Sequence, residues 1–413
     1  KGSLSMLRRL EDARILMYSH DTFGLGHLRR CRTIAHALVE RYKQLSVLIL
    51  SGSPIIGSFD FRSRVDFVRV PGVIKLRNGE YTPLNLHIDI AETLSMRASI
   101  IQHTAEMFDP DLFIVDKEPV GLRGEVLPTL KALKRRGTRL VLGLRDVMDE
   151  PRLLEPEWQR KKALPALREL YDEIWVYGLP QICDPLEGIA LPPRVRQKMV
   201  YTGYLHREVS TQGTPARLPE IANRPYLLVT TGGGGDGEAL IDWVLRAYEH
   251  DPLLPYPALL VLGPFMAAEK QAEFMDRAAK LKRVDAITFH KQMETLVDRA
   301  AGVVAMGGYN TFCEVISLDK RALIVPRTEP RLEQYIRASR AAKLGLVAML
   351  KDDGNYDPAV MAAALRALPR QNRPSEVVVP GLLEGLTNVS RLVAPWMEPA
   401  EEALPSRAVS RIH

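Results

Sequence analysis

The sequence has few cysteines and no long apolar run. Its 413 residues include only three cysteines, Cys31, Cys183 and Cys313, which are far apart. This spacing excludes a disulfide framework and a Cys-x-x-Cys metal site, and it is typical of a reducing compartment. No apolar run approaches the roughly 18 residues that a membrane span requires, and the N-terminus shows no apolar signal segment. We therefore expect a cytoplasmic protein without a transmembrane helix.

A strong charge imbalance is also absent. The formal net charge is +6, and the excess is spread along the chain. It favours an anionic partner, such as a nucleotide diphosphate or an anionic lipid surface. No basic stripe is interleaved with aromatic residues, so we do not expect nucleic-acid binding. Arg8 and Arg9 could meet anionic headgroups at the inner face of the membrane, but ordinary surface charge explains them equally well.

The length suits two domains of about 200 residues each. Apolar runs alternate with amphipathic stretches twice along the chain, with a Gly- and Pro-rich segment between Tyr201 and Pro225. This pattern predicts an α/β protein with two Rossmann-like domains. The predicted boundaries are 6–203 for the N-terminal domain, 204–224 for a linker, 225–380 for the C-terminal domain, 381–400 for a helix that packs back toward the N-terminal domain, and 401–413 for a tail.

The first candidate site is Gly24-x-Gly26-His27, between a predicted strand and a predicted helix. The glycines allow a substrate to approach backbone amides at the helix N-terminus. His27 is a candidate general base because the ordinary pKa of histidine is close to working pH. A histidine that merely caps the helix is the alternative.

Two further glycine-containing turns lie in the second half of the chain. Gly232–Gly235 leaves amides free to face phosphate oxygens, although a loop without a ligand has the same composition. Gly308, Asn310 and Thr311 open a helix that offers amide and hydroxyl donors to phosphates, and Glu314 lies about one turn later. Glu314 could accept both hydroxyls of a ribose or be an ordinary helical charge. Glu333 and Gln334 could bind sugar hydroxyls or simply begin the next helix.

Charged residues follow two strands that are predicted in the first half. These are Asp116-Lys-Glu118 and Arg145-Asp146. The carboxyl ends of strands in an open α/β sheet face the ligand crevice, so Asp116 and Asp146 are candidates for an acceptor site or a second acid or base. Salt-bridged residues at the rim of the sheet are an equally good interpretation.

With these motifs together, the chain resembles the family 28 glycosyltransferases, which include the bacterial enzyme that glycosylates lipid I and the plant galactolipid synthases. The resemblance rests on Gly26-His27, the turn at Gly232, and the stretch from Gly308-x-Asn-Thr-x-x-Glu314 to Glu333-Gln334. It implies a GT-B fold, two Rossmann-like domains that face each other across a cleft. It also implies a metal-independent transferase with a nucleotide-sugar donor, preferably a UDP-sugar, and an acceptor such as a lipid-linked or polysaccharide precursor.

The resemblance also assigns residues to roles. It implies that the base lies near Phe289 and His290, the ribose on Glu314, the phosphates on the glycine turns and the first turn of the following helix, and the hexose on Glu333 and Gln334. The catalytic candidates are His27, Asp116 and Asp146. The donor-binding candidates are Gly24, Gly26, Gly233, Gly234, Phe289, His290, Gly308, Asn310, Thr311, Glu314, Arg331, Glu333 and Gln334.

Three other functions stay open at this point. The segment Gly-His-x-x-Arg-Cys31 is also similar to the UDP-sugar hydrolases of pseudaminic acid synthesis, in which the histidine activates water. In that interpretation Arg30 is the arginine of the motif and Asp146 supports His27. A nucleotide-sugar epimerase and a silent nucleotide-binding protein are the remaining alternatives.

Overall fold

The first half of the chain folds into a parallel sheet with helices on both faces. The computed structural model describes residues 12–21, 26–76, 78–148, 151–209, 214–232, 235–329 and 331–397. The strand order of the first sheet is β3-β2-β1-β6-β7-β8-β9. Its strands are β1 (Ala13–Ser19), β2 (Leu45–Ser51), β3 (Val65–Arg69), β6 (Leu112–Asp116), β7 (Arg139–Arg145), β8 (Glu173–Tyr177) and β9 (Met199–Tyr201).

Helices cover this sheet because strands buried on both faces need apolar partners on each side. Helix α2 packs on one face, and α3, α4 and α6 pack on the other. A small antiparallel hairpin of β4 (Val73–Lys75) and β5 (Tyr81–Pro83) stands beside the sheet. The helices are α2 (Gly26–Arg41), α3 (Ile90–Phe108), α4 (Leu127–Arg135), α5 (Pro151–Arg160), α6 (Ala163–Glu169) and α7 (Pro193–Arg196).

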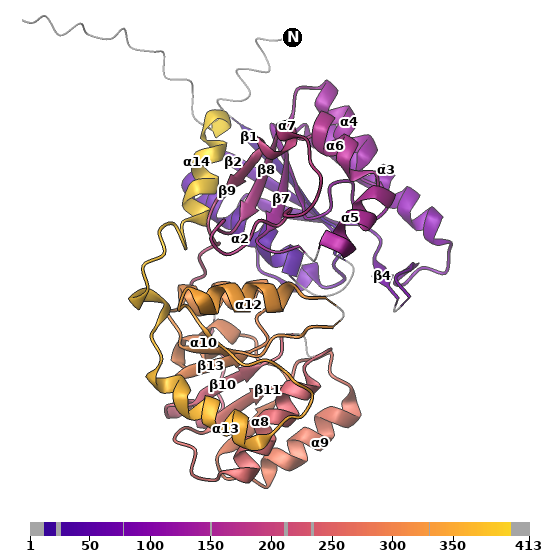
Figure 1. The fold of residues 1–413 in the computed structure, drawn as a ribbon. Coiled ribbons are helices and arrows are strands. Elements are labelled where there is room, and N and C mark those ends of the chain that lie inside the picture. The colour runs from indigo at the N-terminus through magenta and orange to yellow at the C-terminus, as the bar shows by residue number, and fades with distance from the viewer. Residues whose placement is uncertain are drawn as a thin grey trace, which may run out of the picture.

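The second half repeats the arrangement with a sheet in the order β12-β11-β10-β13-β14-β15 (Figure 1). Helices α10, α11 and α12 cover one face, and α8, α9 and α13 cover the other. The strands are β10 (Leu227–Thr230), β11 (Ala258–Val261), β12 (Val284–Ile287), β13 (Gly302–Ala305), β14 (Ala322–Ile324) and β15 (Ala348–Met349). The helices are α8 (Glu238–His250), α9 (Ala268–Ala279), α10 (Met293–Arg299), α11 (Tyr309–Ser317), α12 (Glu333–Lys343), α13 (Pro358–Ala367) and α14 (Gly385–Met397).

The predicted α/β class with two parallel, Rossmann-like sheets is therefore confirmed. Strand order reverses beside β1 in the first sheet and beside β10 in the second, as in doubly wound folds. Such a reversal leaves a crevice at the carboxyl ends of the strands, which is where the candidate residues are placed.

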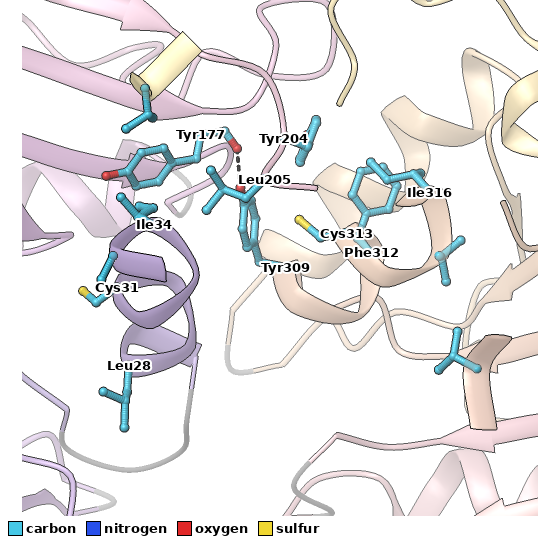
Figure 2. Close-up of a cluster of buried hydrophobic side chains, with 14 of the residues drawn as sticks. Leu28, Cys31, Ile34, Tyr177, Tyr204, Leu205, Tyr309, Phe312, Cys313 and Ile316 are labelled. Atoms are coloured by element: carbon cyan, nitrogen blue, oxygen red, sulfur yellow. Dashed lines mark hydrogen bonds between the residues drawn. The ribbon is translucent and has the colours of Figure 1, made fainter. Parts of the chain in front are cut away.

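An apolar layer joins the two halves of the molecule (Figure 2). Leu28 and Ile34 of α2 belong to the same buried cluster as Phe312 of α11. The hydroxyl of Tyr309 donates a hydrogen bond of 2.5 Å to the carbonyl of Tyr177, at the end of β8. The starts of α2 and α11 are consequently held close to each other.

Helix α14 returns to the first sheet, where it packs against α2 (Figure 1). The Asn388 side-chain amide donates to the carbonyl of Thr202, and the Tyr42 hydroxyl donates to the carbonyl of Ser390, both at 2.7 Å. The chain thus crosses between the two units twice, once after β9 and once before α14.

Candidate active site

Two helix N-termini converge where the two sheets face each other. A Cβ atom built on Gly26, the first residue of α2, would lie 3.5 Å from Nδ2 of Asn310 in the first turn of α11. Arg207 joins the same two helices, because its Nη1 donates to Thr33 and its Nη2 donates to Asn310 at 2.7 Å. Helix N-termini carry partial positive charge, so this junction favours an anion.

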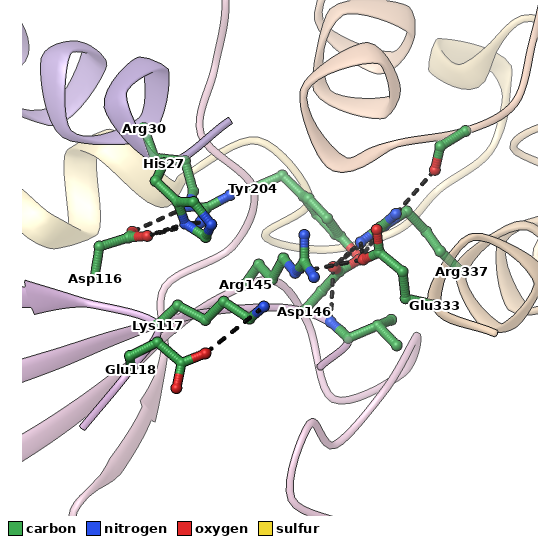
Figure 3. A network of polar contacts seen from close by, with 12 residues as sticks. His27, Arg30, Asp116, Lys117, Glu118, Arg145, Asp146, Tyr204, Glu333 and Arg337 are labelled. Atoms are coloured by element: carbon green, nitrogen blue, oxygen red, sulfur yellow. Dashed lines mark hydrogen bonds and ion pairs between the residues drawn. The ribbon is translucent and has the colours of Figure 1, made fainter. Parts of the chain in front are cut away.

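His27 lies at this junction with Asp116, the last residue of β6 (Figure 3). Its Nδ1 is 2.6 Å from Asp116 Oδ2, while Arg30 donates to both oxygens of Asp116 at 3.1 and 2.8 Å. The side chain of Asp116 is only 3% exposed, whereas that of His27 is 17% exposed. The same Nδ1 also lies 2.7 Å from Nη2 of Arg30, whereas Nε2 of His27 makes no hydrogen bond to any described residue.

The charges of this group follow from its surroundings. Burial lowers the pKa of His27 to about 4, although Asp116 acts in the opposite direction. Burial disfavours an ionised Asp116, but Arg30 and His27 outweigh this effect and hold its pKa below the usual range. At neutral pH the arrangement is a neutral imidazole oriented by a carboxylate. Such an imidazole can accept a proton at Nε2 and be stabilised as an imidazolium.

Asp146 does not belong to this group, which corrects the sequence interpretation that it is catalytic or supports His27. Its side chain is fully buried and is bound by Arg337 of α12, with Arg337 Nη2 2.8 Å from Oδ1 and Nε 2.9 Å from Oδ2. The Tyr204 hydroxyl also donates to Oδ2 at 2.5 Å. Both oxygens of Asp146 are occupied and shielded from a substrate, so its role is to join the two units (Figure 3).

Glu333 and Gln334 begin α12 and are nearly buried. Arg337 donates to Glu333 at 3.1 Å, and Arg145 Nε lies 3.4 Å from the same oxygen. Burial disfavours the ionised Glu333, yet Arg145 and Arg337 lower its pKa to about 2. Gln334 Oε1 accepts from the backbone of Arg327 at 3.1 Å. Glu333 is therefore an ionised carboxylate held among cations, and its contact with a sugar hydroxyl stays a prediction.

Helix α11 carries the residues that the sequence interpretation assigns to the ribose and the phosphates. Gly308 is its N-cap, Asn310 and Thr311 lie in its first turn, and Glu314 follows one turn later. Glu314 is 9% exposed, and burial raises its pKa to about 7. Gly307, just before the helix, has φ +86°, and a Cβ there would lie 2.6 Å from Ile324 Cγ2. Only glycine fits the turn that aims α11 at the junction.

The remaining donor-binding candidates differ in their exposure to solvent. Phe289 is 59% exposed, and the nearby His290 is buried with Nε2 3.2 Å from the carbonyl of Arg217. Arg331 lies two residues before α12 and acts electrostatically on Lys117. Gly24, Gly233 and Gly234 lie outside the described residues.

Sequence reasoning missed three side chains of this region. His20 directly follows β1, and the centre of its buried ring lies 4.3 Å from that of His27. Arg337 and Arg207 bridge the two units, as described above. A local signal existed for Arg337 alone, since it lies four residues after Glu333 on the predicted helix.

No group of three or more His, Cys, Asp or Glu side chains in the described part of the chain is arranged to hold a metal ion. Within the same residues, every helix is too short or too polar to cross a bilayer.

Comparison with known proteins identifies similarities in two respects, the sequence of the second half of the chain and the overall fold. The family model of the glycosyltransferase family 28 C-terminal domain matches residues 227–374, from β10 past α13. No curated protein matches the sequence significantly.

Several solved structures share the architecture over nearly their whole length. A UDP-glucosyltransferase from Polygonum tinctorium matches with a TM-score of 0.63 and 12% identity, covering 94% of this chain and 99% of that one. MurG from Acinetobacter baumannii matches with 0.56 and 14%, covering 93% and 99%. The UDP-GlcNAc 2-epimerase of Methanocaldococcus jannaschii matches with 0.57 and 12%, covering 92% and 99%. The predicted GT-B fold is confirmed, and at these identities the likeness concerns the fold alone.

Proposed function

We propose that this chain moves a hexose-type sugar from a UDP-sugar to a hydroxyl acceptor. The proposal is supported by the match of residues 227–374 to the glycosyltransferase family 28 C-terminal domain and by the GT-B fold. The family match bears out the predicted transferase class. The donor, the acceptor, the absence of a metal requirement and the residue roles below are our proposal.

The observation that carries the proposal is the pairing of His27 with Asp116 at 2.6 Å, with Nε2 left for a substrate. In this mechanism Nε2 accepts the proton of the acceptor hydroxyl, the acceptor oxygen bonds to the anomeric carbon of the sugar, and the bond from that carbon to the diphosphate breaks. Asp116 orients the ring and stabilises the imidazolium that forms. The departing diphosphate adds negative charge nearby, which raises the basicity of His27 during the reaction above that of the ligand-free site.

The leaving diphosphate has its own candidates. The first turn of α11, with Gly308, Asn310 and Thr311, offers backbone amides and a hydroxyl at a helix N-terminus. The α2 N-terminus and Arg207 lie beside it. Fixed dipoles and a guanidinium can stabilise the developing charge without a bound cation. We assign the ribose hydroxyls to Glu314, one turn further along α11.

The same His27–Asp116 pair could activate water, and one of the matched folds belongs to an epimerase. The first experiment is therefore a thermal-shift screen against UDP-, GDP-, dTDP- and CMP-sugars. The best donor is then assayed for nucleotide release with and without a cell lipid extract and a polysaccharide-precursor fraction. Release that needs either addition supports transfer. Release in buffer alone indicates a hydrolase, and an isomeric sugar nucleotide indicates an epimerase.

His27→Ala tests the chemistry directly. We expect turnover to fall by roughly a hundredfold or more, because general-base catalysis contributes about that much. Donor affinity by calorimetry should stay within about twofold, because the phosphate and ribose contacts belong to α11. His103→Ala, on an exposed position of α3, is the matched control. Turnover near the wild-type value in His27→Ala would remove the base assignment.

A further inference from the structure

Two cations, Lys117 and Arg145, extend into the site from the ends of neighbouring strands (Figure 3). Lys117 follows β6 and Arg145 ends β7, and their side chains are 13% and 15% exposed. Both lie between the His27–Asp116 pair and Glu333 with Arg337. The mechanism above uses neither of them.

The carboxylates near these cations are already shared. Lys117 Nζ is 3.9 Å from Glu118, but Glu118 lies closer to Lys161, at 3.1 Å. Arg145 Nε lies 3.4 Å from Glu333, which also accepts from Arg337. Nε of Arg145 is buried without a hydrogen bond among the described residues. Among the described residues, Lys117 Nζ thus has no carboxylate closer than 3.9 Å and Arg145 Nε has no hydrogen bond, so one further anionic group could complete the contacts of both side chains.

The electrostatics agree with this geometry. Burial is the main cause that lowers the pKa of Lys117 to about 7, and repulsion from Arg145 and Arg331 adds to it, while Glu118 and Glu333 oppose the shift. Buried cations repel each other, and an anion that binds between them stabilises their charged forms.

The backbone at Lys117 is also unusual. Its φ is +63°, in the left-handed region that non-glycine residues rarely adopt, and its backbone amide donates to the carbonyl of Gly143 at 2.8 Å. This conformation places the residue after Asp116 so that its side chain points into the site. Asparagine and glycine adopt this region more readily than lysine, so the choice of lysine is not explained by the turn.

We propose that Lys117 and Arg145 bind a phosphate or carboxylate group of the sugar acceptor, so that the acceptor is an anionic molecule. This inference rests on the proposed function, which places the acceptor hydroxyl at Nε2 of His27. Groups of the acceptor that neighbour that hydroxyl then reach the residue next to Asp116. The phosphates of the donor are accounted for by α11 on the other side of the junction.

The test uses sulfate, a fully ionised mimic of phosphate, titrated calorimetrically into protein that is saturated with UDP to block the diphosphate site. We expect wild type to bind sulfate and Lys117→Asn to bind it about tenfold to a hundredfold more weakly, since one charge-assisted contact is lost. Lys117→Arg should retain binding. Lys117→Asn suits the left-handed backbone, so it should fold, and Lys280→Asn is the exposed control.

Proton uptake gives a second readout. Sulfate binding at pH 7.5 should be accompanied by proton uptake in wild type, because the bound anion favours the charged lysine, and by none in Lys117→Arg. Equal sulfate affinity in wild type and Lys117→Asn would refute the anion site. Failure of UDP to bind would instead refute the proposed function.

A second experiment tests whether the anionic group belongs to the acceptor or to the sugar of the donor. UDP-glucose and UDP-glucuronate should bind with similar affinity if the anion belongs to the acceptor. A preference of tenfold or more for UDP-glucuronate that disappears in Lys117→Asn would assign the anion to the donor sugar and overturn the acceptor assignment.

Discussion

The buried ion pair between Arg337 and Asp146 makes a strong prediction about how the two halves of the molecule are held together. Arg337 contacts Asp146 through both Nε and Nη2, and its Nη1 donates to the carbonyl of Gly307 at 2.8 Å. Both side chains are fully buried. Arg337→Met should keep most of the apolar volume while leaving Asp146 without its cation; Glu333, the other carboxylate that Arg337 contacts, keeps Arg145.

The expected cost follows from what remains around the carboxylate. Removing one partner of a buried ion pair typically costs about 3–5 kcal/mol, because the other charge stays desolvated. Tyr204 and the backbone amide of Val147 still donate to Asp146, so we expect a value near the lower end, about 3 kcal/mol. At roughly 2–4 °C per kcal/mol, the melting temperature should fall by about 6–12 °C.

Thermal and urea unfolding of four variants tests this reasoning. Asp146→Asn keeps a side-chain oxygen for Tyr204 and removes the negative charge, so the double variant with Arg337→Met should be more stable than Arg337→Met alone. Arg366→Met, which breaks an exposed ion pair with Asp251, should cost less than about 1 kcal/mol. An Arg337→Met variant within 1 kcal/mol of wild type, or additive effects in the double variant, would show that this pair does not couple the two halves.

Three further predictions concern the active site. Burial raises the pKa of Glu314 to about 7, so this group adds stability that is fully present below its unfolded pKa near 4.5 and lost as pH rises through 7. Glu314→Gln should therefore gain stability relative to wild type between pH 4.5 and 8, by about 3 kcal/mol. We also expect UDP affinity to rise through pH 7 in wild type, as the carboxylate ionises, and to show no such rise in Glu314→Gln. Constant relative stability across that range would contradict the assignment. Asp116→Asn should lower turnover by roughly a hundredfold or more, with UDP affinity by calorimetry unchanged, because His27 loses the charge that stabilises its protonated form. Gly307→Ala should weaken UDP binding and lower the melting temperature, because the added Cβ meets Ile324 Cγ2 at 2.6 Å; wild-type behaviour in both assays would show that the turn can relax.

Much of the fold could be predicted because its signals are local. Helix α8 at Glu238–His250 coincides with an amphipathic stretch of the sequence, and strand β13 at Gly302–Ala305 coincides with a short apolar run. Strand β12 ends at Ile287, where its pairing with β11 ends, whereas the apolar run extends to Phe289; beyond the strand, the carbonyl of Thr288 still accepts a hydrogen bond from the backbone amide of Gly263. Apolar periodicity reports burial, and it cannot report where a neighbouring strand stops.

The contacts between the two domains could not be predicted, because they too depend on a part of the chain that is distant in sequence. Arg337 and Asp146 are 191 positions apart, and each has an ordinary local context, one on a polar helix and one after an apolar strand. Asp116 and Asp146 both follow buried strands, so the sequence offered both as catalytic candidates. Only the packing of α12 against the end of β7 shows that the second one is closed off.

The choice between the two aspartates does, however, follow in part from two periodicities taken together. Side chains alternate along a strand, so Asp116 shares a face with Leu112 and Ile114, and both of these pack in the cluster that contains α2. On α2, residues three and four apart share a face, which places His27 and Arg30 on the side that also buries apolar residues against the sheet. One strand face and one helix face thus meet at a carboxylate, an imidazole and a guanidinium. The two periods agree with the contact of His27 with Asp116 once the structure shows which face of the sheet α2 covers, whereas a contact across the two domains has no such local rule.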